Sequence, residues 1–416
     1  MNNTVTIKTI EEASKRINGI AKNTPLQHAK RLSELFEATI FLKREDLQRV
    51  RSYKIRGSYN LMKSLLDKEK ANGVVCASAG NHAQGVAYSA AALKIHADIF
   101  MPVKTPLQKI NRVKHFGGAW IKIHLVGNTY DESYKEALKY CKDKKATLVH
   151  PFDDPRVISG AGTIAKEIYD ELGQNIDYII CTIGGGGLIS GVGTYLTQKI
   201  KKIKVIGTEP KGAPSMYEAL KKRKVITLDA IDTFVDGAAV KTVGQKTFDI
   251  AKTVVSEIIL VPEGKVCTTM IDLYQNEGIV AEPAGALSIS ALDFMAEKIK
   301  GKTVVCILSG GNNDILRYPE IMERSLIYLG RKHYFLIEFA QKPGQLRQFV
   351  DKALGPTDDI VRFEYIKKSA KETGPALVGI EQEKKEDYDK LIHQMNNFGI
   401  IYKIITSNDL IYNYLI

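Results

Sequence analysis

Short apolar runs alternate with amphipathic stretches over about the first 310 residues, and this alternation constrains the fold more than any other feature of the chain. The runs contain Val, Ile and Cys without a period-two polar pattern, which is typical of strands buried on both faces. Strands are therefore predicted at residues 39–43, 73–78, 98–102, 120–126, 178–183, 204–208 and 303–309. Helices are predicted between them, at 59–69, 82–93, 129–142 and 163–172. This order predicts an α/β body with mostly parallel sheets.

The pattern changes near residue 317, where a single polar helix at 317–330 is predicted to act as a linker. The domain boundaries are placed at 1–320, 321–332 and 333–416, with a small lobe at about 57–155 inside the first. The last segment reads strand, helix, strand, strand, helix, strand, at residues 333–339, 344–352, 360–366, 376–380, 386–396 and 400–405. That order is typical of a ferredoxin-like α+β domain.

Composition excludes several classes of protein. No run reaches the roughly 18 apolar residues of a membrane span, and the first ten residues lack the pattern of a secretory signal. The net charge of 59 − 47 = +12 could suggest nucleic acid, but the basic residues are scattered rather than gathered in one stripe. The five cysteines are odd in number and contain no Cys-x-x-Cys pair, so we expect no metal site and a cytoplasmic protein with reduced thiols.

The strongest candidate for a ligand site is the run Gly184, Gly185, Gly186, Gly187 and Leu188, which follows a predicted strand and precedes a predicted helix. Consecutive glycines let backbone N–H groups surround a phosphate, and the helix N-terminus adds its dipole. A dinucleotide site is the competing interpretation, and it fails because its third glycine would have to be Ile189. A tight turn without a ligand is the other alternative, although four glycines cost backbone entropy that such a turn does not require.

Three further elements carry side chains suited to chemistry. Lys54 could be a surface residue, or a desolvated amine with a lowered pKa that forms an imine with an aldehyde. The loop from Ser78 to His82 could serve only to begin a helix, or could offer donors to an anion. Ser309 follows a strand and precedes two glycines. An imine-forming lysine, a phosphate loop and a hydroxyl partner for a pyridine nitrogen together favour pyridoxal phosphate as the cofactor.

These elements occur in a recognisable order. The motifs are Thr24-Pro-Leu, Lys43-Arg-Glu-Asp-Leu-Gln, Ser52-Tyr-Lys-Ile-Arg-Gly, Ser78-Ala-Gly-Asn-His-Ala-Gln-Gly, the glycine run at 184–188, Ala281-Glu-Pro-Ala-Gly and Ser309-Gly-Gly-Asn. In this order they resemble the fold-type II pyridoxal-phosphate enzymes, and more narrowly the biosynthetic threonine dehydratases of the short form. The resemblance covers the whole chain, and it implies a two-lobed catalytic body followed by one ACT-like regulatory domain.

The resemblance also implies a role for each site residue. Lys54 would bind pyridoxal 5'-phosphate covalently and serve as the catalytic base, and Asn81 would bond the ring hydroxyl. Residues Gly184, Gly185, Gly186, Gly187 and Leu188 would hold the phosphate, and Ser309 would face the pyridine nitrogen. The substrate carboxylate would lie on the loop formed by Ser78, Ala79, Gly80, Asn81 and His82.

The implied reaction converts L-threonine to 2-oxobutanoate and ammonia, the first committed step of isoleucine biosynthesis, with a side activity on L-serine. The family further implies a cytoplasmic homotetramer and isoleucine or valine as effector. One departure is Ala161, which stands where the family usually has Gln.

Three alternatives remain beside this interpretation. A catabolic serine/threonine dehydratase would usually lack the C-terminal domain. Serine racemase would need an acid at Ala79, and its metal-binding stretch would need Asp at Ser215. An amino-acid sensor derived from an enzyme would have lost the lysine or the glycine loop, and both are present.

Overall fold

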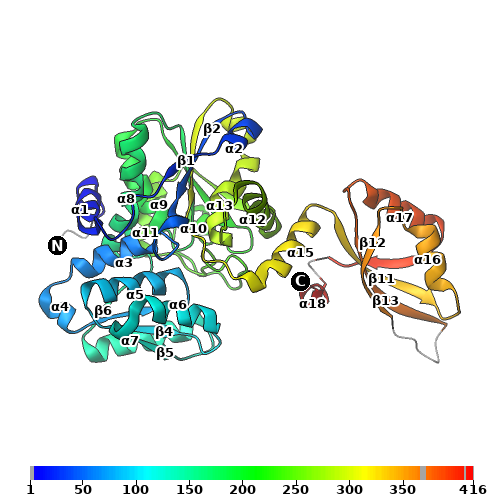
Figure 1. The fold of residues 1–416 in the computed structure, drawn as a ribbon, viewed down its shortest axis with the longest axis horizontal. Coiled ribbons are helices and arrows are strands. Elements are labelled where there is room, and N and C mark those ends of the chain that lie inside the picture. Colours follow the sequence, from blue (N-terminus) through cyan, green and yellow to red (C-terminus); the bar gives the residue numbers. More distant parts are fainter. Residues whose placement is uncertain (1–3, 366–371, 407–408, 416) are drawn as a thin grey trace. The chain divides into compact units, whose positions relative to one another are not determined.

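A computed structural model describes residues 4–365, 372–406 and 409–415, apart from the side chain of Asn413 (Figure 1). The described chain forms two compact units. The larger unit runs to Glu263 and takes in Leu273–Asn313, and the smaller contains Gly264–Asp272 and the chain from Asp314 onward. Within the described ranges, no helix combines the length and apolar character that a membrane span requires.

The larger unit contains two sheets. The six-stranded sheet has the order β1-β2-β10-β7-β8-β9 and is parallel except where β1 pairs with β2. Its strands are β1 (Leu26–His28), β2 (Thr39–Arg44), β7 (Tyr178–Thr182), β8 (Lys204–Pro210), β9 (Glu257–Val261) and β10 (Thr303–Leu308). The four-stranded sheet has the order β5-β4-β3-β6 and is entirely parallel. Its strands are β3 (Val74–Ala77), β4 (Ala97–Met101), β5 (Ile121–Leu125) and β6 (Thr147–Leu148).

Helices cover both sheets, and their apolar faces form separate cores. The core of the large sheet includes Ile179, Ile189 and Val305, and that of the small sheet includes Val74, Ile99 and Val86, all at most 1% exposed. The helices of this unit are α1 (Ile7–Ile17), α2 (Lys30–Leu35), α3 (Lys54–Lys63), α4 (Asp67–Ala71), α5 (Asn81–Leu93), α6 (Leu107–Gly117), α7 (Tyr130–Lys144), α8 (Pro155–Leu172), α9 (Gly187–Lys199), α10 (Ser215–Lys222), α11 (Gln245–Val254), α13 (Pro283–Ser290) and α14 (Ala296–Ile299), and α12 (Glu263–Glu277) belongs partly to each unit. Short 3-10 turns lie at Glu45–Leu47, Gly118–Trp120 and Ala291–Phe294.

The smaller unit contains an antiparallel sheet of order β12-β13-β11-β14. After a 3-10 turn at Ile315–Arg317, its elements are α15 (Tyr318–Tyr328), β11 (Lys332–Ala340), α16 (Gln345–Ala353), β12 (Asp359–Tyr365), β13 (Thr373–Glu381), α17 (Asp387–Asn397), β14 (Ile401–Ile404) and α18 (Tyr412–Leu415). One sheet face packs with α16 and α17 around Phe335 and Val378 (Figure 1). The predicted element order is therefore correct; residue 366, the last of a predicted strand, lies outside the described residues.

Two predicted boundaries are wrong. The helix expected at 59–69 is two helices, because α3 begins at Lys54 and ends at Lys63 before α4. The helix expected at 163–172 begins at Pro155, where the Asp154 carboxylate accepts a hydrogen bond from the backbone N–H of Arg156 and a proline occupies the first turn.

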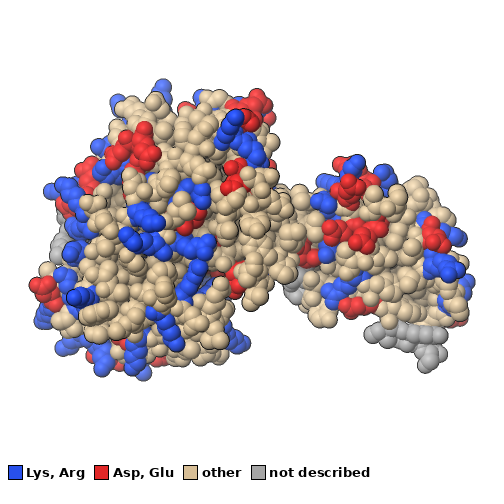
Figure 2. Space-filling view, viewed as in Figure 1, with Lys and Arg blue, Asp and Glu red and all other residues tan. Residues whose placement is uncertain are grey.

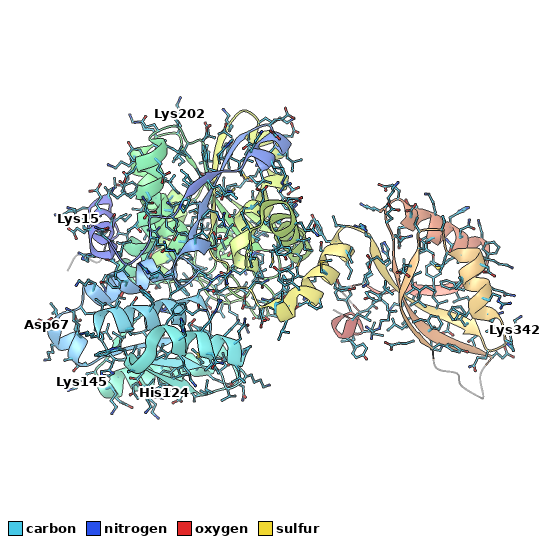
Figure 3. All side chains as sticks on the ribbon, in the orientation of Figure 1. Lys15, Asp67, His124, Lys145, Lys202 and Lys342 are labelled. Atoms are coloured by element: carbon cyan, nitrogen blue, oxygen red, sulfur yellow. The ribbon has the colours of Figure 1, made fainter. Side chains whose placement is uncertain are left out.

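Surface charge is mixed. On the face drawn in Figure 2, lysine and arginine side chains are interspersed with acidic and uncharged ones. Lys15, Lys145 and Lys202, labelled in Figure 3, are exposed and far apart in the sequence, on α1, after α7 and after α9. On the face drawn, the positive side chains do not form a continuous stripe.

Candidate active site

Lys54 is the first residue of α3, and its position is set by a short bridge between two loops. Ser52 pairs with Gly310, and the N–H of Tyr53 donates to the Ser309 carbonyl at 3.1 Å. The Lys54 Nζ donates to the Pro151 carbonyl at 2.9 Å. Burial lowers the pKa of Lys54 to about 8, although the nearby Glu282 carboxylate acts in the opposite direction. The fraction of neutral amine at pH 7 is therefore about 10%, against roughly 0.03% for an ordinary lysine.

The glycine run connects β7 to α9. Gly185 to Leu188 are buried, and Gly186 has a φ of 93°, which a side chain would strain. A Cβ at Gly185 would overlap the ring of Phe152, and one at Gly187 would lie 3.1 Å from that side chain. Among the residues that the structure describes, none accepts a hydrogen bond from the backbone N–H groups of 184–188. Buried donors of this kind require an acceptor, and an anion at the N-terminus of α9 provides one.

The loop that begins with Ser78 follows β3 and leads into α5. Ser78 Oγ accepts a hydrogen bond from the Gly80 N–H at 3.2 Å, and residues 78–81 are only partly buried. The first turn of α5 supplies N–H groups that have no intrahelical acceptor. This loop therefore presents donors at a partly open position, as a carboxylate site requires.

His82 has a different environment from the rest of that loop. Its Nε2 lies 2.7 Å from the Val149 carbonyl, and since a carbonyl only accepts, Nε2 carries the proton. Burial, and secondly the charge of Lys54, lower the pKa of His82 to about 3. Nδ1 has no partner within the described part of the chain. The ring is thus neutral at physiological pH.

Asn81 and Ser309 are the other two predicted contacts of the cofactor ring. The Asn81 Nδ2 donates to Glu282 Oε1 at 2.6 Å, and its Oδ1 accepts from Asn312 Nδ2 at 2.7 Å. Ser309, which follows β10, donates from Oγ to the Ala284 carbonyl at 3.2 Å. β10 and β7 are neighbours in the large sheet, so Ser309 and the glycine run leave the same edge.

Short contacts therefore connect Lys54 with the glycine run, Ser309 and Asn81. Lys54 bonds to Pro151, whose neighbour Phe152 packs on the glycine run. The backbone next to Lys54 bonds to Ser309, and Asn312, three residues later, holds Asn81. Phe152, Glu282 and Asn312 were not predicted from the sequence to have a role, although Glu282 and Asn312 lie within the motifs Ala281-Glu-Pro-Ala-Gly and Ser309-Gly-Gly-Asn.

The residues fit pyridoxal phosphate. Partner-free backbone donors are suited to the phosphate, a partly neutral amine can attack an aldehyde, and the Ser309 hydroxyl can turn toward a ring nitrogen. Asn81 keeps one N–H that nothing among the described residues accepts.

A buried ion network supports the start of α3. The Arg56 guanidinium donates to Glu45 at 2.8 Å through both Nε and Nη2, and to Glu167 at 2.6 and 2.8 Å. Lys43 lies 2.7 Å from Glu167. Arg56, Glu45 and Lys43 are 0% exposed. Burial alone would raise the pKa of Glu45, but the charge of Arg56 brings that pKa below its ordinary value.

Two other residues singled out in the sequence, Ala161 and Glu209, have structural contacts. Ala161 is 2% exposed in the large core. The Glu209 carboxylate accepts from the N–H groups of Met216 and Tyr217, both at 2.8 Å, and from Ser215 Oγ at 3.3 Å, so it caps α10. No cluster of three or more metal-binding side chains occurs in the described part of the chain.

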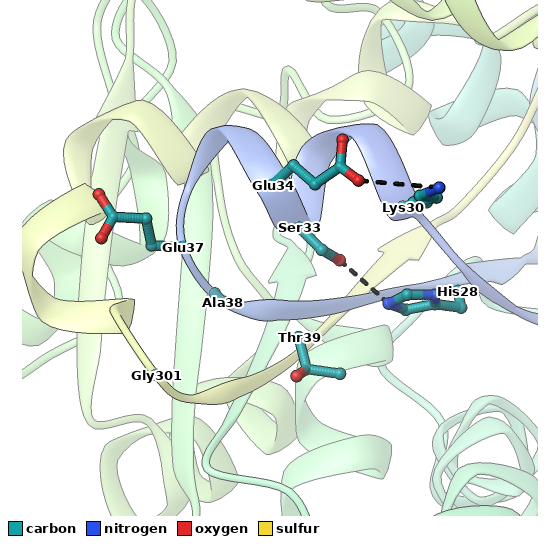
Figure 4. A pocket seen from close by; sticks show the side chains of 8 residues that line it. All are labelled: His28, Lys30, Ser33, Glu34, Glu37, Ala38, Thr39 and Gly301. Atoms are coloured by element: carbon teal, nitrogen blue, oxygen red, sulfur yellow. Dashed lines mark hydrogen bonds and ion pairs between the residues drawn. The ribbon is translucent and has the colours of Figure 1, made fainter.

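A surface hollow of about 500 Å³ lies beside α2, and none of its lining residues is a predicted site residue (Figure 4). Its polar contacts are a bond of 3.3 Å between Ser33 and His28 and an ion pair of 3.9 Å between Lys30 and Glu34. Because these ionic side chains are largely exposed, this hollow lacks the desolvated groups that distinguish the Lys54 region.

Comparison with known proteins identifies both parts of the chain. Residues 17–310 match the family model described as pyridoxal-phosphate dependent enzyme, and residues 323–415 match the C-terminal regulatory domain of threonine dehydratase. The chain is 52% identical to the biosynthetic L-threonine dehydratase of Halalkalibacterium halodurans over 412 residues, which are 99% of each protein. It is also 52% identical to that of Bacillus subtilis, over 100% of this chain and 98% of the relative.

Solved structures agree with this assignment. The processed form of threonine deaminase isoform 2 from Solanum lycopersicum has a TM-score of 0.74 at 36% identity, covering 78% of this chain and 91% of that one. Serine racemase from Dictyostelium discoideum has a TM-score of 0.69 at 32% identity, covering 75% of this chain and 99% of that one. The chain thus belongs to the pyridoxal-phosphate dependent enzymes of fold type II and, within them, to the threonine dehydratases that carry a C-terminal regulatory domain.

Proposed function

We propose that this enzyme dehydrates and deaminates L-threonine to 2-oxobutanoate and ammonia, the first committed step of isoleucine biosynthesis, with a side activity on L-serine. The observation that carries the proposal is the partly buried amine of Lys54, which donates at 2.9 Å to the Pro151 carbonyl, next to Phe152, which packs on the glycine run with its partner-free N–H groups. When bound there, pyridoxal phosphate supplies a sink for the electrons released at Cα.

The chain's own residues would then divide the work. The neutral amine of Lys54 takes the Cα proton as general base. The N–H groups from Ser78 to His82 orient the substrate carboxylate. The glycine run, Asn81 and Ser309 hold the phosphate, the ring hydroxyl and the ring nitrogen respectively. A serine hydroxyl leaves that nitrogen less protonated than a carboxylate would, which favours elimination over transamination. The β-hydroxyl departs and, together with the proton that Lys54 takes from Cα, makes up the water that is lost; one water is taken up again when the released enamine is hydrolysed to 2-oxobutanoate and ammonia.

The test is an assay of ammonia and 2-oxoacid release by the purified holoenzyme, with threonine and serine compared. Lys54→Ala should abolish turnover and keep the fold, because it removes the imine and the base together. Lys63→Ala, at the exposed end of the same helix, is the matched control and should be unchanged. Near-normal ammonia release by Lys54→Ala would refute the assignment, and interconversion of D- and L-serine without ammonia would favour a racemase.

We further propose that the smaller unit senses isoleucine, or else valine, in a cytoplasmic homotetramer. Gly344, with a φ of 85°, begins α16 and leaves first-turn N–H groups for a carboxylate. The five free cysteines suit a reducing compartment. Threonine saturation curves of the full chain with and without isoleucine, together with calorimetry, test the effector. Absence of both binding and a shifted curve would remove the sensing role and leave threonine turnover intact.

A further inference from the structure

Glu282 is a buried carboxylate in the site to which the mechanism above gives no role. It is 7% exposed and directly precedes α13, and its backbone N–H donates to the Gly310 carbonyl at 3.2 Å. Its Oε1 accepts from Asn81 Nδ2 at 2.6 Å and its Oε2 accepts from the Asn312 N–H at 3.1 Å. Both carboxylate oxygens are therefore occupied by groups of the site.

These contacts fix the orientation of the Asn81 side chain. Its oxygen accepts from Asn312 and its nitrogen donates to Glu282. If the amide were turned over, its nitrogen would face the Asn312 donor and its oxygen would face the Glu282 carboxylate, and neither hydrogen bond could form. Glu282 takes only one of the two hydrogens of Nδ2, and the other has no acceptor among the described residues. Asn81 is thereby held as a donor with one hydrogen free.

The surroundings leave room for this carboxylate. A side chain at Gly310 would overlap Glu282 Oε1 and would lie 3.3 Å from Asn81 Nδ2. Ser52 stands opposite Gly310 in the antiparallel bridge, so its side chain points to the same face. The Ser52 hydroxyl is buried without a partner in the part of the chain that the structure describes.

Titratable groups from three parts of the larger unit interact electrostatically with Glu282. Tyr53 and Lys54 lie at the start of α3, Lys109 and Arg112 lie on α6, and Asp236 lies before α11. Burial, and secondly the charge of Asp236, raise the pKa of Glu282 to about 7. The hydrogen bonds from Asn81 and Asn312 and the charge of Lys109 lower it by less. In return, the carboxylate makes Lys54 easier to protonate.

We propose that Glu282 is a positioning residue of this site, which fixes Asn81 as a hydrogen-bond donor to bound pyridoxal phosphate and sets the charge beside Lys54. The inference rests on the proposed function, because Asn81 and Lys54 are cofactor contacts only there. It predicts that removing the charge weakens cofactor binding and changes how the bound cofactor responds to pH, while recognition of threonine remains.

The experiment compares the parent holoenzyme with Glu282→Gln, which keeps the size of the side chain and removes its charge. Absorbance of the bound cofactor is titrated from about pH 5.5 to 9, and the apparent Kd is measured by adding pyridoxal phosphate to the apoenzyme. In the parent, the spectrum should change with a midpoint near 7, and Glu282→Gln should lose that midpoint. The apparent Kd should rise roughly tenfold, as expected when a hydrogen bond of a charged pair is lost, and kcat should fall with KM for threonine little changed.

Glu209→Gln is the matched control, because Glu209 is also buried and burial raises its pKa to about 7 as well. This variant should lose thermal stability and keep the spectral midpoint. A midpoint near 7 that persists in Glu282→Gln would overturn the proposal, as would its loss in Glu209→Gln alone.

Glu282→Asp covers the case in which the glutamine variant does not fold. A side chain shorter by one methylene cannot reach both Asn81 and Asn312, so the aspartate variant should keep a pH-dependent spectrum and bind the cofactor more weakly. An apparent Kd within twofold of the parent would refute the positioning role. Failure of the proposed function is distinguishable, because the parent itself would then release no ammonia from threonine.

Discussion

Replacing Arg56 by Met should destabilise the larger unit by several kcal/mol. Arg56 is 0% exposed and makes four hydrogen bonds of 2.6 to 2.8 Å with Glu45 and Glu167. With Lys43, these residues form a set of two positive and two negative charges. Removing the guanidinium leaves one buried negative charge uncompensated, and breaking a buried pair in this way costs about 3 to 5 kcal/mol.

The melting temperature gives the measurable shift. Unfolding entropy is about 2.1 cal/mol/K per residue, so the larger unit, with about 300 residues, has roughly 0.6 kcal/mol/K. A loss of about 3 to 5 kcal/mol then lowers the apparent melting temperature by about 5 to 8 °C. The assay is thermal unfolding of the apoenzyme followed by circular dichroism at a fixed heating rate.

Two further variants separate charge imbalance from lost packing. Arg56→Met combined with Glu45→Gln restores the balance of charge and should recover part of the loss. Lys298→Met breaks an exposed pair, 2.9 Å from Glu257, and should shift the melting temperature by about 1 °C or less. A fall below about 2 °C for Arg56→Met, or no recovery in the double variant, would refute this account of the network.

Three further predictions concern the site and its pH dependence. Burial raises the pKa of Glu209 to about 7, so the native state binds this proton more tightly than the unfolded chain does. The free energy of unfolding should therefore fall between about pH 4.5 and 7. In Glu209→Gln, the melting temperature plotted against pH should be flatter over that range. The rate at which the apoenzyme takes up pyridoxal phosphate should rise roughly tenfold from pH 6 to 7 and level off above pH 8, because the neutral amine of Lys54 is the reactant. Stopped-flow absorbance measures this rate. A rate that does not depend on pH would contradict the lowered pKa of Lys54. Ser309→Asp should protonate the ring nitrogen, alter the visible spectrum and reduce elimination in favour of side reactions; an unchanged spectrum and rate would show that Ser309 does not face the ring.

The features that could be predicted from sequence are those carried by contiguous residues. Four glycines in a row, a strand before them and a helix after them predict a phosphate loop without knowledge of any distant residue. Strands β2, β3, β4, β5, β7, β8 and β10 could be predicted for a related reason, since each lies in a short run rich in apolar residues. Three strands were missed: β1 and β6, with three and two residues, were too short to form a pattern, whereas β9 (Glu257–Val261) was missed although all of its residues after Glu257 are apolar.

Contacts between distant residues could not be predicted. Glu282 is 201 positions from Asn81, and Glu167 is 111 positions from Arg56. Charged side chains are almost never fully buried unless paired, so an arginine in a sequence is expected at the surface. The start of α3 was missed for a related reason. No side chain caps it, and the bridge between Ser52 and Gly310 determines where the helix begins.

Glu282 did have a signal in the sequence, and it lies in the composition of its surroundings. It is the only charged residue between Gly278 and Leu292, a stretch that is otherwise apolar or small. A segment of that kind is expected to be buried, and a carboxylate within it requires partners. Pro283 follows directly, which excludes Glu282 from the helix interior and favours the extended backbone observed, with φ −82° and ψ 163°. A lone acid that is forced to the buried start of an apolar helix points to a polar site at that end, where Asn81 and Asn312 are found.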